Sequence, residues 1–281
     1  MIGIDFGASF VDIAVIEGNR LKRAYSIPQK HYSFAVLENI LAGENDGRGK
    51  GKRKAAPISI TGAKSGNAGI AAVAKKNPKL RELEKRQRIV EVGEIGAIAE
   101  GAKFLTGKEK FVVVNVGTGT PFVFVDGKKS EHIAGTGIGG GTLEGLARLL
   151  LNAEVTELEK IAKNGNHGLD LTVFDLVRRK MGKLPPETTA SNFGKAMNAP
   201  KIKNEDVAAS LLKMVGEILG VMGVLAIKGK GCEEIIFTGR VIDENATIRA
   251  RIDAAVKLFG GRAIFPENAK YCTAIGAAIL G

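Results

Sequence analysis

Two stretches of the chain share one pattern of apolar runs separated by glycine-containing turns. Residues 1–16 have the pattern of a strand, a Gly-Ala-Ser turn and a second strand. In the middle of the chain, a β-branched run at 112–114 leads through Gly-Thr-Gly-Thr at 117–120 to an apolar run at 122–125. Short apolar runs bounded by glycines predict buried β-strands. The chain is therefore predicted to carry an internal repeat of a strand–loop–strand unit, with one copy in each half.

A second glycine-rich loop follows the central repeat. Residues 135–142 (Gly-Thr-Gly-Ile-Gly-Gly-Gly-Thr) run directly into a helical pattern of leucines that begins at Leu143. Free backbone N–H groups and the helix dipole both favour phosphate at such a helix N-terminus. The loop matches neither the Walker sequence nor the dinucleotide-binding fingerprint. The alternative interpretation is that these glycines serve only to form turns. Two such loops close together make this alternative less favoured.

Strand and helix patterns alternate along the rest of the chain, which predicts an α/β fold. The segment Thr-Gly-Lys at 106–108 predicts a boundary between an N-terminal domain, 1–107, and a C-terminal domain, 108–281. The other predicted strands span 21–26, 57–62, 89–92, 235–239 and 263–265, and the other predicted helices span 34–41, 67–85, 94–105, 156–163, 171–181, 246–258 and 269–280.

A long helix is predicted from Asn204, as its N-cap, to about residue 228, because two acidic residues follow in the first turn. Gly216, Gly220 and Gly223 would let a neighbouring element approach it closely. These features are typical of a central core helix. The longest apolar tract, 218–227, is too short to span a bilayer, so no membrane association is expected.

Composition narrows the class of protein. A chain of 281 residues with 44% hydrophobic and 25% charged residues is typical of a globular protein. Two cysteines exclude a disulfide framework, and no secretory signal precedes the first strand, so a cytoplasmic location is expected. The net charge of +11 is concentrated at 48–54 and 75–88, but aromatic residues are only 5% and tryptophan is absent. A solvated basic surface is therefore favoured over a nucleic-acid site.

Several motifs together resemble a known superfamily. In order and spacing, the chain is similar to the actin, sugar kinase and heat-shock chaperone (ASKHA) superfamily of ATP-using proteins, and within it to type II pantothenate kinases. The matching segments are 3–7 (Gly-Ile-Asp-Phe-Gly), 115–120 with 126–127, 137–141, 190–194 (Ala-Ser-Asn-Phe-Gly), Gly239 with Asn245, and 267–268 with 274–277.

The resemblance implies a fold and an activity. The fold would be α/β, with two ribonuclease H-like (actin-like ATPase) domains facing a nucleotide cleft. The activity would be that of an ATP-dependent small-molecule kinase, with Mg²⁺, ATP and a small-molecule acceptor such as pantothenate, in coenzyme A biosynthesis. Type II pantothenate kinases are dimers, so the resemblance also implies a homodimer in which the helix at 204–228 lies partly between two subunits.

The resemblance also assigns candidate site residues. Asp5, a carboxylate at a strand end beside a glycine turn, is the expected metal-side and catalytic residue, because hard oxygen ligands suit Mg²⁺. Aligning the strand at 89–92 with the family places the catalytic glutamate on Glu91, with Glu94 and Glu100 as competitors. His132 and Thr120 fall on the acceptor side. The expected nucleotide-binding residues are Gly7, Ala8, Ser9, Gly117, Thr118, Gly119, Gly139, Gly140, Gly141, Thr142, Gly145, Gly239 and Arg240.

Four positions depart from the family pattern. Ala8 replaces a glycine, Asp12 replaces a lysine, His132 replaces an arginine and Arg240 replaces a serine. An arginine-to-histidine change removes a fixed bidentate donor, so these departures leave the acceptor open.

Two other functions remain open at this point. The first is an ATPase or ATP-binding regulator of the same superfamily, one version being an activator of 2-hydroxyacyl-CoA dehydratases. Such activators hold an iron–sulfur cluster between subunits with two cysteines per chain. Cys232 and Cys272 lie outside the expected motifs for that role. The second is a nucleotide-binding protein that kept the fold and lost the chemistry, which Ala8 and Asp12 would explain.

Overall fold

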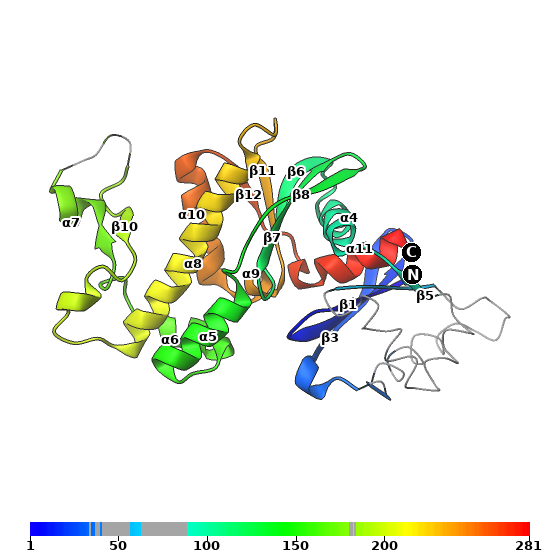
Figure 1. Cartoon of the computed structure of the whole chain (residues 1–281), viewed down its shortest axis with the longest axis horizontal. Helices are drawn as coiled ribbons and strands as arrows, with labels where there is room; N and C mark the ends of the chain where they lie inside the picture. Colours follow the sequence, from blue (N-terminus) through cyan, green and yellow to red (C-terminus); the bar gives the residue numbers. More distant parts are fainter. Residues whose placement is uncertain (34, 37–39, 41–56, 63–88, 180–181, 183) are drawn as a thin grey trace. The chain divides into compact units, whose positions relative to one another are not determined.

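The computed structural model describes residues 1–33, 35–36, 40, 57–62, 89–179, 182 and 184–281 (Figure 1). The helix predicted at 67–85, most of the one at 34–41 and the basic runs at 48–54 and 75–88 lie outside these residues. Two five-stranded sheets carry the fold.

The first sheet has the strand order β3-β2-β1-β4-β5. β1 pairs with β2 and β2 with β3 in antiparallel fashion, whereas β4 is parallel to both β1 and β5. One face buries isoleucines and valines such as Ile4, Ile13 and Ile60. The strands are β1 (Ile2–Phe6), β2 (Phe10–Glu17), β3 (Arg20–Pro28), β4 (Ile58–Thr61) and β5 (Ile89–Glu91).

The second sheet repeats this plan and confirms the internal repeat. Its order is β12-β11-β6-β7-β8, so that β6, β7, β8, β11 and β12 take the places of β1 to β5. β11 is parallel to both β6 and β12, as β4 is to β1 and β5. The strands are β6 (Lys110–Asn115), β7 (Thr120–Asp126), β8 (Lys129–Thr136), β11 (Glu234–Thr238) and β12 (Arg262–Ile264). Residues 135–136, expected in a loop, belong to β8.

Contacts along the chain define two compact units. The first comprises Met1–Glu109, Val123–His132 and Pro266–Gly281, and the second comprises Lys110–Phe122 and Ile133–Phe265. These units are discontinuous along the chain, since 123–132 and 266–281 belong to the first, and the domain boundary at 107/108 stays a prediction.

The C-terminal segment joins the first unit because of α11 (Cys272–Leu280), which packs against α4 (Glu94–Thr106), β1 and β2. Gly3 permits this contact, since a Cβ there would clash with the backbone of Ala274. Ile275 and Ala278 then fill the layer between α11 and the sheet.

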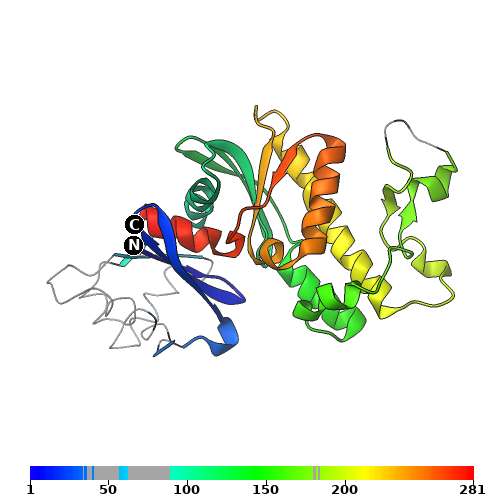
Figure 2. The ribbon, with the colours of Figure 1, turned by 180° about the vertical axis from the view of Figure 1, so that it is seen from behind.

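In the second unit, α8 (Asn204–Ile227) lies along α10 (Ala246–Phe259) and also contacts α6 (Leu158–Ala162) (Figures 1 and 2). A Cβ at Gly220 would lie 2.8 Å from the Cβ of Ala255, so Gly216 and Gly220 admit α10, whereas Gly223 faces Ile235 and Phe237 of β11. Among the described residues, α8 is the one helix long and apolar enough to cross a membrane by length and composition. Of its most apolar window, 61% is buried inside the protein, as in a core helix.

Two local predictions were wrong. Asn204 is the first residue of α8 rather than its N-cap, which is Lys203. The helix predicted at 171–181 is only α7 (Val173–Val177), because Thr172 caps its N-terminus and Arg178, at φ 53°, ends it. The remaining elements are α5 (Gly140–Leu151), α9 (Arg240–Glu244), the short strands β9 (Leu171–Thr172) and β10 (Thr189–Ser191), and the 3-10 turns Gln29–His31, Val155–Glu157, Ala196–Asn198 and Ala269–Tyr271.

Candidate functional site

The parallel strands of each sheet end at one edge, and in open α/β sheets ligands bind at that carboxyl edge. In the first unit, β1, β4 and β5 bring Asp5, Thr61 and the segment 91–94 to this edge. We call Asp5, Asp12, Thr61, Gly62 and Glu94 the Asp5 site.

Asp5 lies directly between two other oxygen-bearing side chains. It pairs with Asp12 of β2 on one side and with Thr61 of β4 on the other. Residues directly opposite one another on adjacent strands project from the same face of a sheet, so the three side chains form a row. Asp12 is only 8% exposed and accepts a hydrogen bond from Ser26 Oγ. Thr61 is fully buried, and its hydroxyl has no hydrogen-bond partner among the described residues.

Burial, with additional contributions from the carboxylates of Asp12 and Glu94, raises the pKa of Asp5 to about 7. The corner after β4 closes over this carboxyl group. A Cβ at Gly62 would lie 2.5 Å from Asp5 Oδ1, and Gly62 has φ 105°, so only glycine suits the position.

Strand register separates the two candidate glutamates. Glu91 pairs with Ile60, which pairs with Ile4, so Glu91 belongs to the face opposite Asp5. Glu94 begins α4, and its carboxylate is one of the causes that raise the pKa of Asp5. Glu100 instead lies 3.5 Å from Lys103 in an ion pair. The structure therefore brings Glu94, and not Glu91, towards Asp5.

The loop between β1 and β2 is tied to the end of β3. Gln29 donates from Nε2 to the carbonyl of Gly7 at 2.8 Å, and its backbone N–H donates to Ser9 at 2.8 Å. Ala8 and Ser9 are both exposed. The methyl group of Ala8 is thus at the surface of the loop, where a ligand could reach the backbone beside it.

In the second unit, the two glycine-rich loops interlock. The backbone N–H groups of Gly140 and Gly141 donate to the carbonyls of Gly117 and Thr118, at 2.7 and 3.0 Å. The hydroxyl of Thr120 donates to the carbonyl of Ile138 at 2.7 Å. The expectation of free N–H groups at this helix terminus is therefore wrong for Gly140 and Gly141, because the neighbouring loop already takes them.

Other expected residues at these loops have structural partners as well. A Cβ at Gly139 would lie 2.7 Å from the carbonyl oxygen of Thr118, so the loops need glycine to pack. Thr142 donates from Oγ1 to the carbonyl of Gly137 at 2.7 Å. Thr118 itself is exposed, Gly119 is half-buried, and Gly145 faces open space.

The ends of β6 and β11 are joined at the carboxyl edge of the second sheet. Thr238 Oγ1 donates to Asn115 Oδ1 at 3.0 Å. Gly239, at φ 96°, turns the chain so closely that a Cβ would clash with the carbonyl of Val116. Arg240 then begins α9 and lies 2.8 Å from Glu244 in an ion pair. His132, the expected acceptor-side residue, is exposed on β8.

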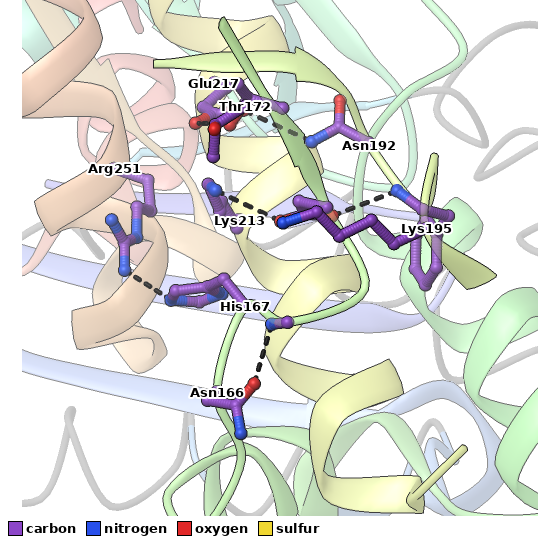
Figure 3. Close-up of polar contacts among 12 residues, drawn as sticks. Asn166, His167, Thr172, Asn192, Lys195, Lys213, Glu217 and Arg251 are labelled. Carbon is purple, nitrogen blue, oxygen red and sulfur yellow. Dashed lines mark hydrogen bonds and ion pairs between the residues drawn. The ribbon is translucent and has the colours of Figure 1, made fainter. Parts of the chain in front are cut away.

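A buried polar cluster beside α8 is absent from the sequence-based expectations (Figure 3). Lys213 Nζ lies 3.1 Å from Asp170 Oδ2, and both side chains are almost completely buried. Asp170 Oδ1 accepts the backbone N–H of Phe193 at 3.0 Å. Glu217 accepts hydrogen bonds from Thr189 and Asn192, at 2.8 and 3.2 Å. Asp170 and Glu217, which lie outside the Ala-Ser-Asn-Phe-Gly motif, thus hold it in place. The sequence signal for this cluster was the presence of charged residues, Lys213 and Glu217, within the otherwise apolar helix α8.

His167 belongs to the same cluster and lies 2.5 Å from Arg251 through Nε2. Burial lowers the pKa of His167, and the positive charges of Arg251 and Lys213 lower it further, against smaller opposing effects of acids. The neutral imidazole is therefore the form that this cluster stabilises.

The described residues contain no group of three or more histidine, cysteine, aspartate or glutamate side chains placed to hold a metal ion. Mg²⁺ does not need such a group, since it usually binds through one or two carboxylates, water and substrate phosphates. Asp5 and Asp12, with the unpartnered hydroxyl of Thr61, provide hard oxygen donors of that kind.

Two sheets of identical strand order, each with a loop after its first strand, define the two-domain α/β fold of the ASKHA superfamily. Solved structures with this fold include component A of the (R)-2-hydroxyglutaryl-CoA dehydratase of Acidaminococcus fermentans, with a TM-score of 0.65 and 16% identity over 100% of this chain and 96% of that one. A ROK family glucokinase from Streptomyces griseus, in complex with glucose and AMPPNP, has a TM-score of 0.60 and 14% identity over 100% and 98%.

The sequence profile of the Fumble family matches residues 80–280, and the chain belongs to this family. A type II pantothenate kinase of Bacillus cereus is 28% identical over 99% of this chain and 97% of its own length. One from Oceanobacillus iheyensis is 29% identical over 99% and 98%. These relatives and the kinase fold make the chain a phosphotransferase.

Proposed function

We propose that the chain transfers the γ-phosphoryl group of ATP to a hydroxyl group of pantothenate. The observation that carries this proposal is the Asp5 site, with a carboxylate at the end of β1, a second carboxylate on the same face and a glutamate at the start of α4. Phosphoryl transfer needs such groups to hold a cation and to align a nucleophile. Pantothenate is the acceptor because relatives that span nearly the whole chain are named type II pantothenate kinases.

The residues take the following roles in this proposal. Mg²⁺, when bound, would neutralise phosphate charge, and Asp5 would hold it. Glu94 would accept the proton of the acceptor hydroxyl, since its carboxylate is close enough to Asp5 to affect its pKa. The loop at 7–9 and the exposed Thr118 would contact phosphates, and Gly239 and Arg240 would contact the nucleotide. His132 would lie on the acceptor side.

Two alternatives have less support. An iron–sulfur activator would need accessible thiols, but Cys272 is buried in α11, where Sγ donates to the carbonyl of Ile98 at 3.6 Å. A protein that binds nucleotide without catalysing a reaction was suggested by Ala8. That residue is exposed and leaves the loop backbone accessible to a ligand, so it does not favour the loss of catalysis. We further propose a cytoplasmic homodimer; light scattering with size-exclusion chromatography would measure its mass directly.

The test is ADP release with Mg²⁺ and ATP, with pantothenate, pantoate and pantetheine offered separately. We expect one acceptor to be phosphorylated. Glu94→Gln should lower kcat by about 100-fold or more, as expected for loss of a general base. Glu91→Gln is the matched control and should stay within a few-fold of wild type. A large loss in Glu91→Gln alone would show that Glu91 is the base, and nucleotide binding without acceptor-dependent turnover would refute the kinase.

A further inference from the structure

Gln29 closes the loop between β1 and β2 with two hydrogen bonds. Its Nε2 donates to the carbonyl of Gly7 and its backbone N–H donates to the carbonyl of Ser9, both at 2.8 Å. A Cβ at Gly7 would lie 2.9 Å from the carbonyl oxygen of Phe10, so the turn itself needs glycine. One residue, which directly follows β3, therefore holds both ends of the loop at 7–9.

The internal repeat contains the same arrangement, built from different groups. In the second unit, the carbonyls of Gly117 and Thr118 accept hydrogen bonds from the backbone N–H groups of Gly140 and Gly141, which follow β8. β8 takes the place of β3 in the second sheet. In both units, the loop after the first strand is thus held by the segment that follows the third strand. In the first unit, the side-chain amide of Gln29 replaces a backbone N–H of the second.

The hydrogen bond to Gly7 fixes the direction of a backbone donor. A trans peptide is planar, so its C=O and N–H groups point to opposite sides, and the carbonyl of Gly7 shares a peptide unit with the N–H of Ala8. Because the Gly7 carbonyl points to Gln29, the Ala8 N–H points away from it. Among the described residues, the N–H groups of Ala8 and Ser9 donate to no backbone carbonyl, and both residues are exposed. The loop therefore presents donors of the kind that bind phosphate oxygens.

We propose that Gln29 is a positioning residue for the nucleotide: through the Gly7 carbonyl, it holds the Ala8 N–H in the orientation that binds the terminal phosphates of ATP. This proposal rests on the proposed function for the identity of the ligand and adds a residue from outside the loop. The terminal phosphates are expected here because the loop directly follows β1, which carries Asp5. Without the side-chain amide of Gln29, the Gly7–Ala8 peptide would be free to rotate, while the backbone bond from Gln29 to Ser9 keeps the loop attached to β3.

The experiment measures the binding of AMPPNP with Mg²⁺ to the full chain by calorimetry. Gln29→Met keeps the length of the side chain but removes its donor, and we expect the Kd of AMPPNP to rise about tenfold, the equivalent of one hydrogen bond. Gln29→Glu should weaken binding at least as much, because a carboxylate cannot donate to the Gly7 carbonyl. Lys22→Met is the matched control. Lys22 donates to Glu17 at 2.7 Å near the other end of β3, and its replacement should leave the Kd within about twofold of wild type.

Two further readouts separate positioning from a general loss of structure. AMP has no β- or γ-phosphate, so its Kd should be the same in wild type and Gln29→Met. In the kinase assay, the KM for ATP should rise about tenfold in Gln29→Met, while the KM for the acceptor stays within about twofold of wild type. If Gln29→Met does not fold, Gln29→Glu carries the same test.

An unchanged Kd for AMPPNP in the Gln29 variants would overturn the proposal, as would an equal loss of AMP and AMPPNP binding. Failure of the proposed function looks different, because AMPPNP binding would still depend on Gln29 while no acceptor supported ADP release.

Discussion

Replacing Lys213 by methionine tests the buried cluster beside α8. The Lys213 side chain is 7% exposed and that of Asp170 is 0% exposed, and their charged atoms are 3.1 Å apart. Methionine keeps the length and apolar stem of lysine but removes the ammonium group. Asp170 would then be a buried carboxylate that, among the described residues, keeps the hydrogen bond from the backbone N–H of Phe193 at 3.0 Å. The substitution therefore isolates the contribution of one charge to the stability of the second unit.

The expected loss follows from what remains in the protein. Removing one partner of a buried ion pair costs about 3–5 kcal/mol, because the other charge stays buried without compensation. Asp170→Asn should also be costly, since it leaves the ammonium group of Lys213 unpaired. The double variant should cost less than the sum of the two, with a coupling energy of about 2 kcal/mol or more. Lys257→Met is the matched control: Lys257 is 72% exposed in its pair with Asp253, and exposed pairs contribute about 0–1 kcal/mol.

The assay is urea-induced unfolding followed by circular dichroism, which reports α8 and does not need the tryptophan that this chain lacks. Midpoint and slope are both required, because a changed slope would indicate a changed native or denatured state rather than lost stability. The reasoning is refuted if Lys213→Met costs no more than Lys257→Met. It is also refuted if the effects of Lys213→Met and Asp170→Asn are simply additive, since the two side chains would then not be coupled.

Three further predictions follow from individual residues. In metal-free protein, the pKa of about 7 for Asp5 exceeds the unfolded value of 3.8, so the folded state binds this proton more tightly and gains stability as pH falls from about 7 towards 4. The gain in the free energy of unfolding is at most about 4 kcal/mol. Urea unfolding of wild type and Asp5→Asn at pH 8 and pH 5 should show this gain only in wild type. The lowered pKa of His167 acts in the opposite direction, so in His167→Gln the loss of stability below about pH 6.5 should be smaller when measured by the same unfolding series. Gly239→Ala should destabilise the protein by more than about 1 kcal/mol and weaken ATP binding in calorimetry, because its φ of 96° and the nearby Val116 carbonyl exclude a Cβ; unchanged stability would refute this.

The elements that local pattern predicts well are the strands. Apolar runs bounded by glycines located β1, β2, β6 and β7, because a buried strand needs a short apolar run and a turn needs glycine. The place of α11 could not be predicted in this way. Its small, apolar sequence is compatible with either unit, and its packing on β1 depends on Gly3, far away in the sequence. Likewise, Asp170 and Lys213 are distant in sequence, and only the folded chain shows that each neutralises the other.

The candidate site shows the same limit at the scale of one residue. Asp5 could be predicted because a carboxylate at the end of a buried strand is recognisable from sequence. The choice between Glu91 and Glu94 could not, because β5 is three residues long and a shift of one residue in register reverses which side chains share a face. Pairing of Glu91 with Ile60 fixes that register and leaves Glu94 as the glutamate whose carboxylate contributes to the raised pKa of Asp5. The glycine loops show the opposite case. Their sequence predicts a phosphate site, but the backbone N–H groups of Gly140 and Gly141 donate to carbonyls of the neighbouring loop. Within the second unit, the exposed Thr118 and the turn at Gly239 therefore remain the predicted phosphate contacts, and the amides at the start of α5 do not.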